Sequence, residues 1–204
     1  YVLNKLGLKN LILLSKKQTT TTLSNLPPDT QQYFKILSGY DTLRIILAKR
    51  TILVEGPSDE LIVQKAYFQL HKKLPIQNGV DIINVRGLSF TRFLDIAKEL
   101  DLEISVVTDN DGNYEHKVKS KYSTYESEKI KIYASSDNTK NTLEPHLVSS
   151  VGLDSLNTIF STTYDEVEMI KYMTDCKTEC ALKIFEYSND LTFPEYINDA
   201  VNKE

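Results

Sequence analysis

The sequence predicts an α/β fold in which about four mainly parallel strands are flanked by helices, followed by a helical C-terminal segment. Short runs rich in β-branched residues alternate with longer segments whose apolar residues recur every three or four positions, giving the order strand, helix, strand, helix, strand. Acidic residues directly follow two of these runs. Right-handed crossovers between parallel strands bring the residues after each strand to one edge of the sheet.

Composition and length are those of an ordinary globular protein. The chain has 204 residues, of which 41% are hydrophobic and 25% charged. No apolar run approaches the ~20 residues that span a bilayer, and the first residues lack a signal-peptide pattern. Cys176 and Cys180 lie four apart in a helical pattern, so we expect reduced thiols rather than a disulfide or a metal pair. We expect a cytoplasmic protein with no membrane partner and, since it starts at Tyr1 rather than Met, a portion of a longer one.

Charge is distributed unevenly along the chain. The formal net charge of −4 argues mildly against a free-standing nucleic-acid binder. Residues 1–140, however, carry 20 Lys and Arg against 16 Asp and Glu, whereas residues 141–204 carry 4 against 12. Any surface that faces phosphate should therefore lie on the first two thirds. A solvated surface of uneven sign explains the same counts equally well.

The first fifty residues predict an appendage rather than part of the main sheet. Residues 10–15 resemble a short buried strand, and the polar, Pro-containing stretch that follows is typical of a linker. We therefore assign residues 1–29 to the tail of an upstream domain and a linker. Residues 30–50 predict a helical connector in two pieces, hinged near Gly39.

The main domain is predicted to begin at residue 51. Residues 51–55 form the first strand, and a helix opens at Pro57 and runs to about residue 73. Residues 80–85 predict the second strand. Ser89 is a plausible cap for a helix with an apolar stripe extending to Leu100.

The third strand is predicted at residues 103–108 and the fourth at 129–134, separated by a polar surface loop at 110–128. Helical patterns dominate afterwards. They cover about residues 143–150, 154–160, 164–175, 177–188 and 194–202. We divide this part into a core, residues 51–150, and a helical segment, residues 151–204, that completes the functional region.

Five acids are candidates for one metal site. Glu55 ends the first strand and Asp59 enters the following helix, Asp109 and Asp111 follow the third strand, and Glu144 opens a later helix. Carboxylates gathered at one sheet edge repel one another, and a bound Mg²⁺ or Mn²⁺ ion removes that repulsion. Such hard cations prefer oxygen ligands.

The first two groups of acids, Glu55 with Asp59 and Asp109 with Asp111, also have other structural or functional interpretations. Asp59 is also suited to the N-terminal turn of a helix, where the dipole favours an acid. Asp109 to Gly112 could be a turn stabilised by Asx side chains. An EF-hand is excluded because the glycine is fourth and the twelfth residue is Ser120. A haloacid-dehalogenase-type phosphatase motif, Asp-x-Asp-Gly-Thr, matches except that Asn113 replaces the threonine.

The combination of Glu55-Gly-x-x-Asp59, Gly87 after the next strand and Asp109-x-Asp111 resembles the TOPRIM domain of topoisomerases, primases and related nucleases. The wider stretch 37–187 resembles the OLD (overcoming lysogenization defect) family, in which an ABC-type ATPase precedes a TOPRIM nuclease. Asn141-Thr-Leu-Glu144 is similar to the late acidic motif of that family. Lys177-Thr-Glu-Cys-Ala-Leu is similar to its terminal lysine motif, although Thr178 stands where glycine is commoner.

The resemblance implies a Rossmann-like TOPRIM fold and a DNA endonuclease that uses Mg²⁺ or Mn²⁺ in a two-ion mechanism. It implies Glu55, Asp59 and Asp109 as ligands of one ion, with Asp111 and Glu144 as ligands of a second. The catalytic residues would be Glu55, Asp109 and Lys177, the lysine stabilising the transition-state charge. A lysine that opens an amphipathic helix is otherwise usually solvent-exposed. Expected contacts with the DNA backbone are Arg86, Lys117, Lys119 and Lys121.

Partners follow from the same resemblance. They are DNA, an upstream ABC-type ATPase domain that residues 1–15 would end, and a homo-oligomer formed through that domain. The chain contains no Walker A loop, so we do not expect ATP hydrolysis from it alone. Bacterial or phage-related defence is the role that the family suggests. Two other functions stay open: a TOPRIM module that binds nucleic acid or a partner without cutting, and the phosphatase.

Overall fold

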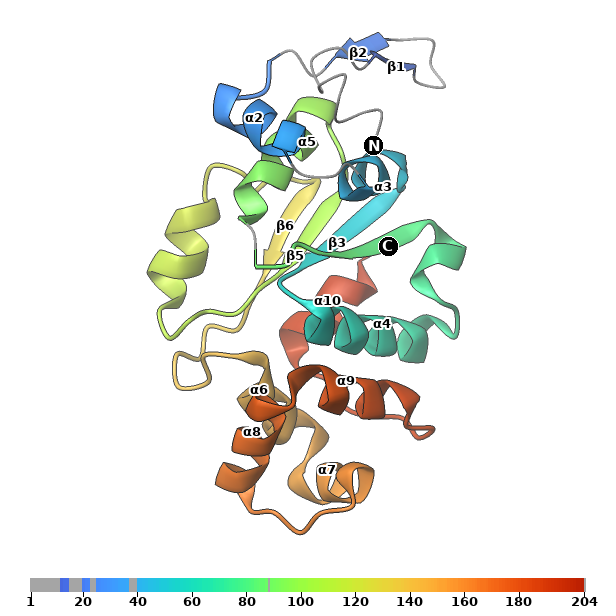
Figure 1. Cartoon of the computed structure of the whole chain (residues 1–204), viewed down its shortest axis with the longest axis vertical. Helices are drawn as coiled ribbons and strands as arrows, with labels where there is room; N and C mark the ends of the chain where they lie inside the picture. The colour runs from blue at the N-terminus through green and yellow to red at the C-terminus, as the bar shows by residue number, and fades with distance from the viewer. Residues whose placement is uncertain (1–11, 15–19, 23–24, 37–39, 88, 204) are drawn as a thin grey trace.

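A parallel sheet of four strands forms the centre of the molecule (Figure 1). The computed structural model describes residues 12–14, 20–22, 25–36, 40–87 and 89–203. The strands are β3 (Arg50–Val54), β4 (Val80–Asn84), β5 (Ile104–Val107) and β6 (Ile130–Tyr133). They lie in the order β4-β3-β5-β6, and every neighbouring pair is parallel. The predicted α/β class and its parallel sheet are confirmed.

The connections create a switch point between β3 and β5. Helix α4 (Pro57–His71) leads from β3 outward to β4, and helix α5 (Phe90–Leu100) leads back across to β5 on the other side of β3. At such a point the loops after two adjacent strands diverge to opposite faces and leave a crevice. The residues directly after β3 and β5 therefore border the same crevice.

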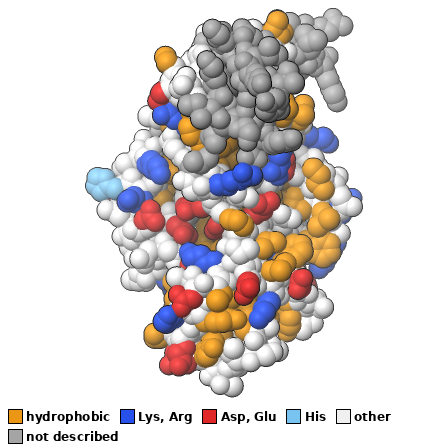
Figure 2. Space-filling view, in the orientation of Figure 1, with side chains coloured by type: hydrophobic (Ala, Val, Ile, Leu, Met, Phe, Trp, Pro, Cys, Tyr) orange, Lys and Arg blue, Asp and Glu red, His pale blue; other side chains and the backbone are white. Residues whose placement is uncertain are grey.

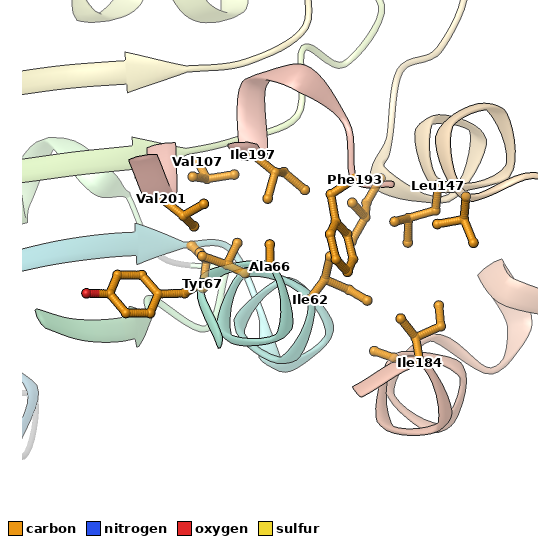
Figure 3. Packing of buried hydrophobic residues seen from close by; sticks show 14 of the residues in the cluster. Ile62, Ala66, Tyr67, Val107, Leu147, Ile184, Phe193, Ile197 and Val201 are labelled. Atoms are coloured by element: carbon orange, nitrogen blue, oxygen red, sulfur yellow. The ribbon is translucent and has the colours of Figure 1, made fainter. Parts of the chain in front are cut away.

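One face of the sheet is covered by α4 and by the helical C-terminal segment. Ile52 and Val54 of β3 point to this face, whereas Leu53 points to the other, as strand alternation requires. The C-terminal helices are α6 (Leu143–Val151), α7 (Leu153–Phe160), α8 (Glu166–Asp175), α9 (Lys177–Glu186) and α10 (Glu195–Asn202). Figure 3 shows side chains of α4, β5, α6, α9 and α10 meeting in one hydrophobic cluster.

Helix α10 is fixed at its C-terminal end by a buried arginine. Arg50, at the start of β3, donates hydrogen bonds to the carbonyl oxygens of Ala200 and Lys203. His71 Nε2 lies 2.9 Å from the carbonyl oxygen of Val201. The last carbonyls of a helix have no partner within it, so a cation at this end both satisfies them and matches the helix dipole.

The opposite face carries α5 with α3 (Tyr40–Leu47) and α2 (Pro28–Ile36). The rings of Phe34 and Phe93 meet edge to face with centroids 5.3 Å apart. Thr30, which is fully buried, donates a 2.5 Å hydrogen bond to Asp95 of α5. The first part of the expected helical connector is therefore docked on α5.

A small hairpin precedes α2. Strand β1 (Ile12–Leu14) pairs antiparallel with β2 (Thr20–Thr22). The strand expected at residues 10–15 is present at Ile12–Leu14, the part of it that the structure describes. Ile12, however, is 62% exposed rather than buried. The threonines expected in the linker form its partner strand. The hinge expected near Gly39 lies outside the described residues.

The segment between β5 and β6 differs from the predicted surface loop. It contains η3 (Glu115–Ser120), a π-helical segment whose Val118 is buried. Tyr122, four residues later, is also buried, and both side chains join the hydrophobic core beneath α5. Two apolar residues among many polar ones were too weak a periodic signal to predict this helix. Within the described ranges, every helix is too short or too polar to cross a membrane.

Candidate functional site

Glu55 links the ends of two strands. It follows β3, and its Oε1 accepts a 2.6 Å hydrogen bond from the Thr108 hydroxyl and a 3.1 Å hydrogen bond from the backbone N–H of Asp109. Its backbone carbonyl accepts a hydrogen bond from the N–H of Gly87, after β4. Glu55 and Asp109 therefore lie at the same edge of the sheet, as predicted.

Asp59 lies in the first turn of α4. Its Oδ2 accepts a 3.1 Å hydrogen bond from the backbone N–H of Gly56, so the side chain caps the helix. Burial and then the neighbouring Glu55 carboxylate raise its pKa to about 6, with a smaller contribution from Glu144. Asp59 thus combines the helix-capping role with membership of the acidic cluster.

Asp109 is the most strongly perturbed acid of this group. Burial, followed by the charges of Asp59, Glu55 and Glu144, raises its pKa to about 8, while Lys177 acts in the opposite direction. Carboxylates crowded in a poorly solvated place cannot all stay ionised without a compensating charge. Protonation or a bound cation would relieve this repulsion.

Glu144 and Lys177 form an ion pair on the α4 side of this cluster. Glu144, in the first turn of α6, is 4% exposed, and its Oε1 lies 2.9 Å from Nζ of Lys177 at the start of α9. Burial alone would lower the pKa of Lys177, but the Glu144 carboxylate and the charge of Asp109 raise it. The lysine is about half exposed and directed at the acids.

Asn110 organises the turn that carries Asp109 and Asp111. It is buried, its amide donates to the carbonyl oxygens of Ser135 and Asp137 at 2.8 and 2.9 Å, and its Oδ1 accepts from the N–H of Gly112 at 2.8 Å. This is the Asx-stabilised turn considered above, and it coexists with a cluster of acids. Asp111 adopts a left-handed conformation, with φ 48°.

A hollow of about 280 Å³ opens beside these acids. Its charged lining consists of Glu55, Asp109, Asp111, Lys117 and Lys121. Asp111 is exposed and lies 4.0 Å from Lys117 Nζ, so it is placed with Glu55 and Asp109 around the hollow, whereas Glu144 is placed with Lys177. Figure 2 shows acidic side chains gathered across the middle of the molecule with basic side chains beside them.

The four expected DNA contacts divide into two groups. Lys117 and Lys121 line the hollow. Lys119 points elsewhere and lies 3.3 Å from Glu115 on the same helical segment. Arg86 is exposed, with φ 55°, directly before Gly87, whose backbone lines the hollow.

The donor set of the cluster suits a hard divalent cation. Every candidate ligand is a carboxylate, and Oε2 of Glu144 is buried without a hydrogen-bond partner. In the part of the chain that the structure describes, no three His, Cys, Asp or Glu side chains stand in a geometry that would hold one ion as placed. Binding would therefore require carboxylate side chains to turn toward a shared ion.

Tyr196 is a neighbour of the cluster that sequence reasoning missed. It lies near the start of α10, is 9% exposed, and packs its ring against His146 with centroids 5.4 Å apart. Burial and then the charges of Asp109 and Asp59 raise the pKa of its phenol well above the usual range. Sequence analysis predicted the helix, but no local pattern indicated that this residue faces the acids.

The region that carries the first two acidic blocks matches a known family. Residues 46–111 match the TOPRIM domain of overcoming lysogenization defect (OLD) protein-like proteins. This region is an OLD-like TOPRIM domain. The match contains Glu55, Asp59, Asp109 and Asp111, all of which border or neighbour the crevice between β3 and β5. No curated protein sequence matches the chain significantly.

Solved structures extend the likeness beyond the matched TOPRIM region. The C-terminal region of the Xanthomonas campestris pv. campestris OLD protein superposes with a TM-score of 0.56 at 18% identity, covering 77% of this chain and 94% of that one. The C-terminal region of the Burkholderia pseudomallei OLD protein gives 0.60 at 14% identity, covering 76% and 95%. At these identities the likeness establishes the fold, in which the TOPRIM domain and the C-terminal helices are combined.

Proposed function

We propose that the chain is the nuclease region of an ATPase-linked OLD-type protein and hydrolyses DNA phosphodiester bonds with Mg²⁺ or Mn²⁺. The observation that supports this most directly is the convergence of Glu55, Asp59, Asp109 and Glu144, with Lys177 alongside, at the switch point of a TOPRIM sheet. Such an arrangement concentrates negative charge where a phosphodiester, itself an anion, would otherwise be repelled. Cations are therefore integral to the proposed chemistry.

The proposed roles follow from position. Glu55, Asp59, Asp109, Asp111 and Glu144 would hold one or two ions, which would withdraw charge from the phosphodiester and stabilise the attacking and leaving oxygens. Thr108 would keep the Glu55 carboxylate in place through its 2.6 Å hydrogen bond.

Lys177 would neutralise charge that develops on the non-bridging oxygens. In the structure it is paired with Glu144, so it would have to turn away from Glu144 to contact the phosphate. Lys117 and Lys121, on the rim of the hollow, would contact the phosphates of the DNA backbone on either side of the bond that is cut.

Plasmid nicking tests the proposal. Purified chain is incubated with supercoiled plasmid and Mn²⁺ or Mg²⁺, beside Asp109→Asn and the exposed control Asp154→Asn, which removes the same charge on α7. We expect relaxed or linear product with wild type and with Asp154→Asn, and none with Asp109→Asn or with EDTA. Equal product from wild type and Asp109→Asn would contradict the assignment.

A binding module that does not cut is the second candidate. The finding that favours it is that no three acids of the described chain are placed to share an ion. Retarded migration of DNA without any cleavage, by this chain and by the full-length protein, would favour this function over the endonuclease.

A further inference from the structure

The helical segment η3, drawn in yellow-green in Figure 1, and the turn that follows it have two faces. Val118 and Tyr122, four residues apart, are 3% and 1% exposed and pack in the hydrophobic cluster beneath α5. Lys117 and Lys121, each one residue earlier, line the hollow beside the acids. Residues four apart share one side of a helix, so the buried pair anchors the segment and the lysine pair borders the candidate site.

The two lysines of the hollow are held in different ways. Nζ of Lys117 lies 4.0 Å from the carboxylate of Asp111. Nζ of Lys121 lies over the face of the Tyr122 ring, 4.9 Å from its centroid, and no carboxylate among the described residues forms an ion pair with it. The quadrupole of an aromatic ring attracts an ammonium group without cancelling its charge. Lys121 therefore brings to the hollow a positive charge that is held in place but not neutralised.

The Tyr122 ring is itself fixed by its surroundings. It meets the ring of Phe90, the first residue of α5, edge to face, with centroids 6.4 Å apart and planes at 70°. Phe90 and Lys121 line the hollow, whereas Tyr122 does not, so the tyrosine lies behind the lysine. Burial raises the pKa of its phenol, and the nearby ammonium of Lys121 acts in the opposite direction. The lysine is thus supported by a tightly packed ring that a ligand in the hollow does not touch.

We propose that Tyr122 is a positioning residue, whose ring holds the Lys121 ammonium in place for a phosphate of the DNA strand in the hollow. This deepens the proposed function and rests on it for the presence of DNA there. Tyr122 does not reach the hollow, so its effect on DNA passes through Lys121.

The benefit of this support is preorganisation. An exposed lysine samples many rotamers, and fixing one of them when DNA binds lowers the affinity. The ring favours the rotamer that points along the hollow before DNA arrives. A cation–π contact at an exposed site raises the population of the held rotamer by about two- to fivefold. The affinity for DNA rises by the same factor at most, because binding draws on the population of the competent state.

A double-mutant cycle tests this dependence. All proteins of the cycle carry Asp109→Asn, so that a labelled duplex oligonucleotide is not cut, and binding is measured by fluorescence anisotropy with Mg²⁺. Lys121→Met should weaken binding about tenfold, as for loss of one charged contact, and should reduce the salt slope by about one. Tyr122→Leu should weaken it about two- to fivefold. In the Lys121→Met protein, Tyr122→Leu should cause no further loss, because the side chain that it supports is gone.

Three further variants distinguish positioning from a general effect on the fold. Tyr122→Phe keeps the ring, so it should recover the binding that Tyr122→Leu loses. Lys119→Met combined with Tyr122→Leu should be additive, because Lys119 lies 3.3 Å from Glu115 rather than over the ring. Lys171→Met removes an exposed charge from α8 and should bind like its parent. Additive losses for Lys121 and Tyr122, or equal losses in the leucine and phenylalanine variants, would overturn the proposal.

An NMR measurement on the wild-type chain covers the case in which Tyr122→Leu does not fold. Protons over the face of an aromatic ring are shifted upfield, so the Hε signals of Lys121 should lie upfield of those of Lys119 and Lys171. Loss of the signal in Lys121→Arg assigns it. Coincident Hε shifts for all three lysines would show that the ring does not hold Lys121 and would overturn the proposal.

The binding and nicking assays keep the two proposals apart. Coupling between Lys121 and Tyr122 in binding, without any nicking of plasmid by the wild type, would uphold the positioning role and refute the endonuclease. Nicking by the wild type without such coupling would do the reverse. Failure of the Asp109→Asn parent to bind the oligonucleotide would overturn the positioning role, whatever the wild type does to plasmid.

Discussion

The hydroxyl of Thr108 donates a 2.6 Å hydrogen bond to Oε1 of Glu55, although the two residues are 53 positions apart in sequence. Each residue directly follows a strand of the central sheet, and the two strands, β3 and β5, are neighbours at the switch point. One short contact thus connects the two acidic blocks of the TOPRIM region and determines how the Glu55 carboxylate is oriented.

Replacement of Thr108 by valine tests the importance of this contact. Valine keeps the shape but removes the donor to a charged acceptor, so the free energy of unfolding should fall by about 2 kcal/mol. The nicking rate should fall about 10- to 100-fold, because Glu55 is no longer held in position. Thr158→Val is the control, since Thr158 is exposed and its hydroxyl bonds only within α7. A Thr108→Val enzyme with wild-type nicking would show that Glu55 needs no such support.

Lys177→Met would leave the buried Glu144 carboxylate without its ion-pair partner. We expect the metal-free protein to lose about 1–3 kcal/mol of stability, measured by urea unfolding. Adding Glu144→Gln should recover part of the loss, because the amide carries no charge. If the two substitutions are simply additive, the pair contributes no interaction energy. Lys177→Met should also reduce nicking about 100-fold, as for other groups that stabilise transition-state charge.

Divalent cations should raise the melting temperature of the chain. An ion that binds only the folded state stabilises it by about 2.7 kcal/mol at a concentration one hundred times its Kd. Titration with Mn²⁺ or Mg²⁺ in a thermal shift assay measures this effect. Glu55→Gln/Asp109→Asn should show at most a small shift, whereas the exposed pair Asp154→Asn/Glu166→Gln should respond like wild type. An equal shift in all three proteins would mean that the ions bind elsewhere.

The metal-free protein should lose stability as the pH rises. The folded-state pKa values of Asp59 and Asp109, about 6 and about 8, lie above their ordinary value of 3.8. The stability that these protonated acids contribute is fully present below about pH 4 and is lost as the pH rises through 6 and then through 8. Melting in EDTA between pH 5 and pH 9 measures the loss. Asp109→Asn should flatten the upper part of the curve, and an unchanged slope would contradict the raised pKa of Asp109.

The sheet and the first two acidic blocks could be predicted because their signals are local. Ile52 to Val54 is a continuous apolar run, and Ile104 to Val107 is apolar except for Ser105, a pattern typical of buried parallel strands. Glu55 follows the first run directly, and Asp109 follows the second after Thr108. The helices after residue 143 were predicted nearly to their ends by their apolar spacing. That Glu144 and Lys177 belong to one site was expected from the family resemblance alone, and their ion pair was not predicted, since no local pattern connects α6 with α9.

What the sequence could not predict depends on tertiary contacts. Val118 and Tyr122 are buried in the hydrophobic cluster beneath α5. A helix with so few apolar residues shows no clear helical periodicity of hydrophobic positions in its sequence. Lys117 and Lys119 cannot be distinguished from the sequence. In the helical segment, Lys119 is directed toward Glu115 and Lys117 toward the hollow. The burial of Tyr196 depends on the packing of α10, whose far end contacts Arg50 and His71.

The continuous hydrophobic cluster of Figure 3 has a consequence for where this protein can be divided. Ile62 and Ala66 of α4 rest on Ile184, Ile197 and Val201, which come more than a hundred residues later. Trimming the polypeptide to the matched stretch 46–111 would remove β6 and the C-terminal helices, and the apolar side chains of α4 and of the sheet that these helices cover would be exposed and prone to aggregate. The shortest fragment that keeps this hydrophobic cluster covered extends through α10. The segment that can fold is therefore longer than the segment that matches the family.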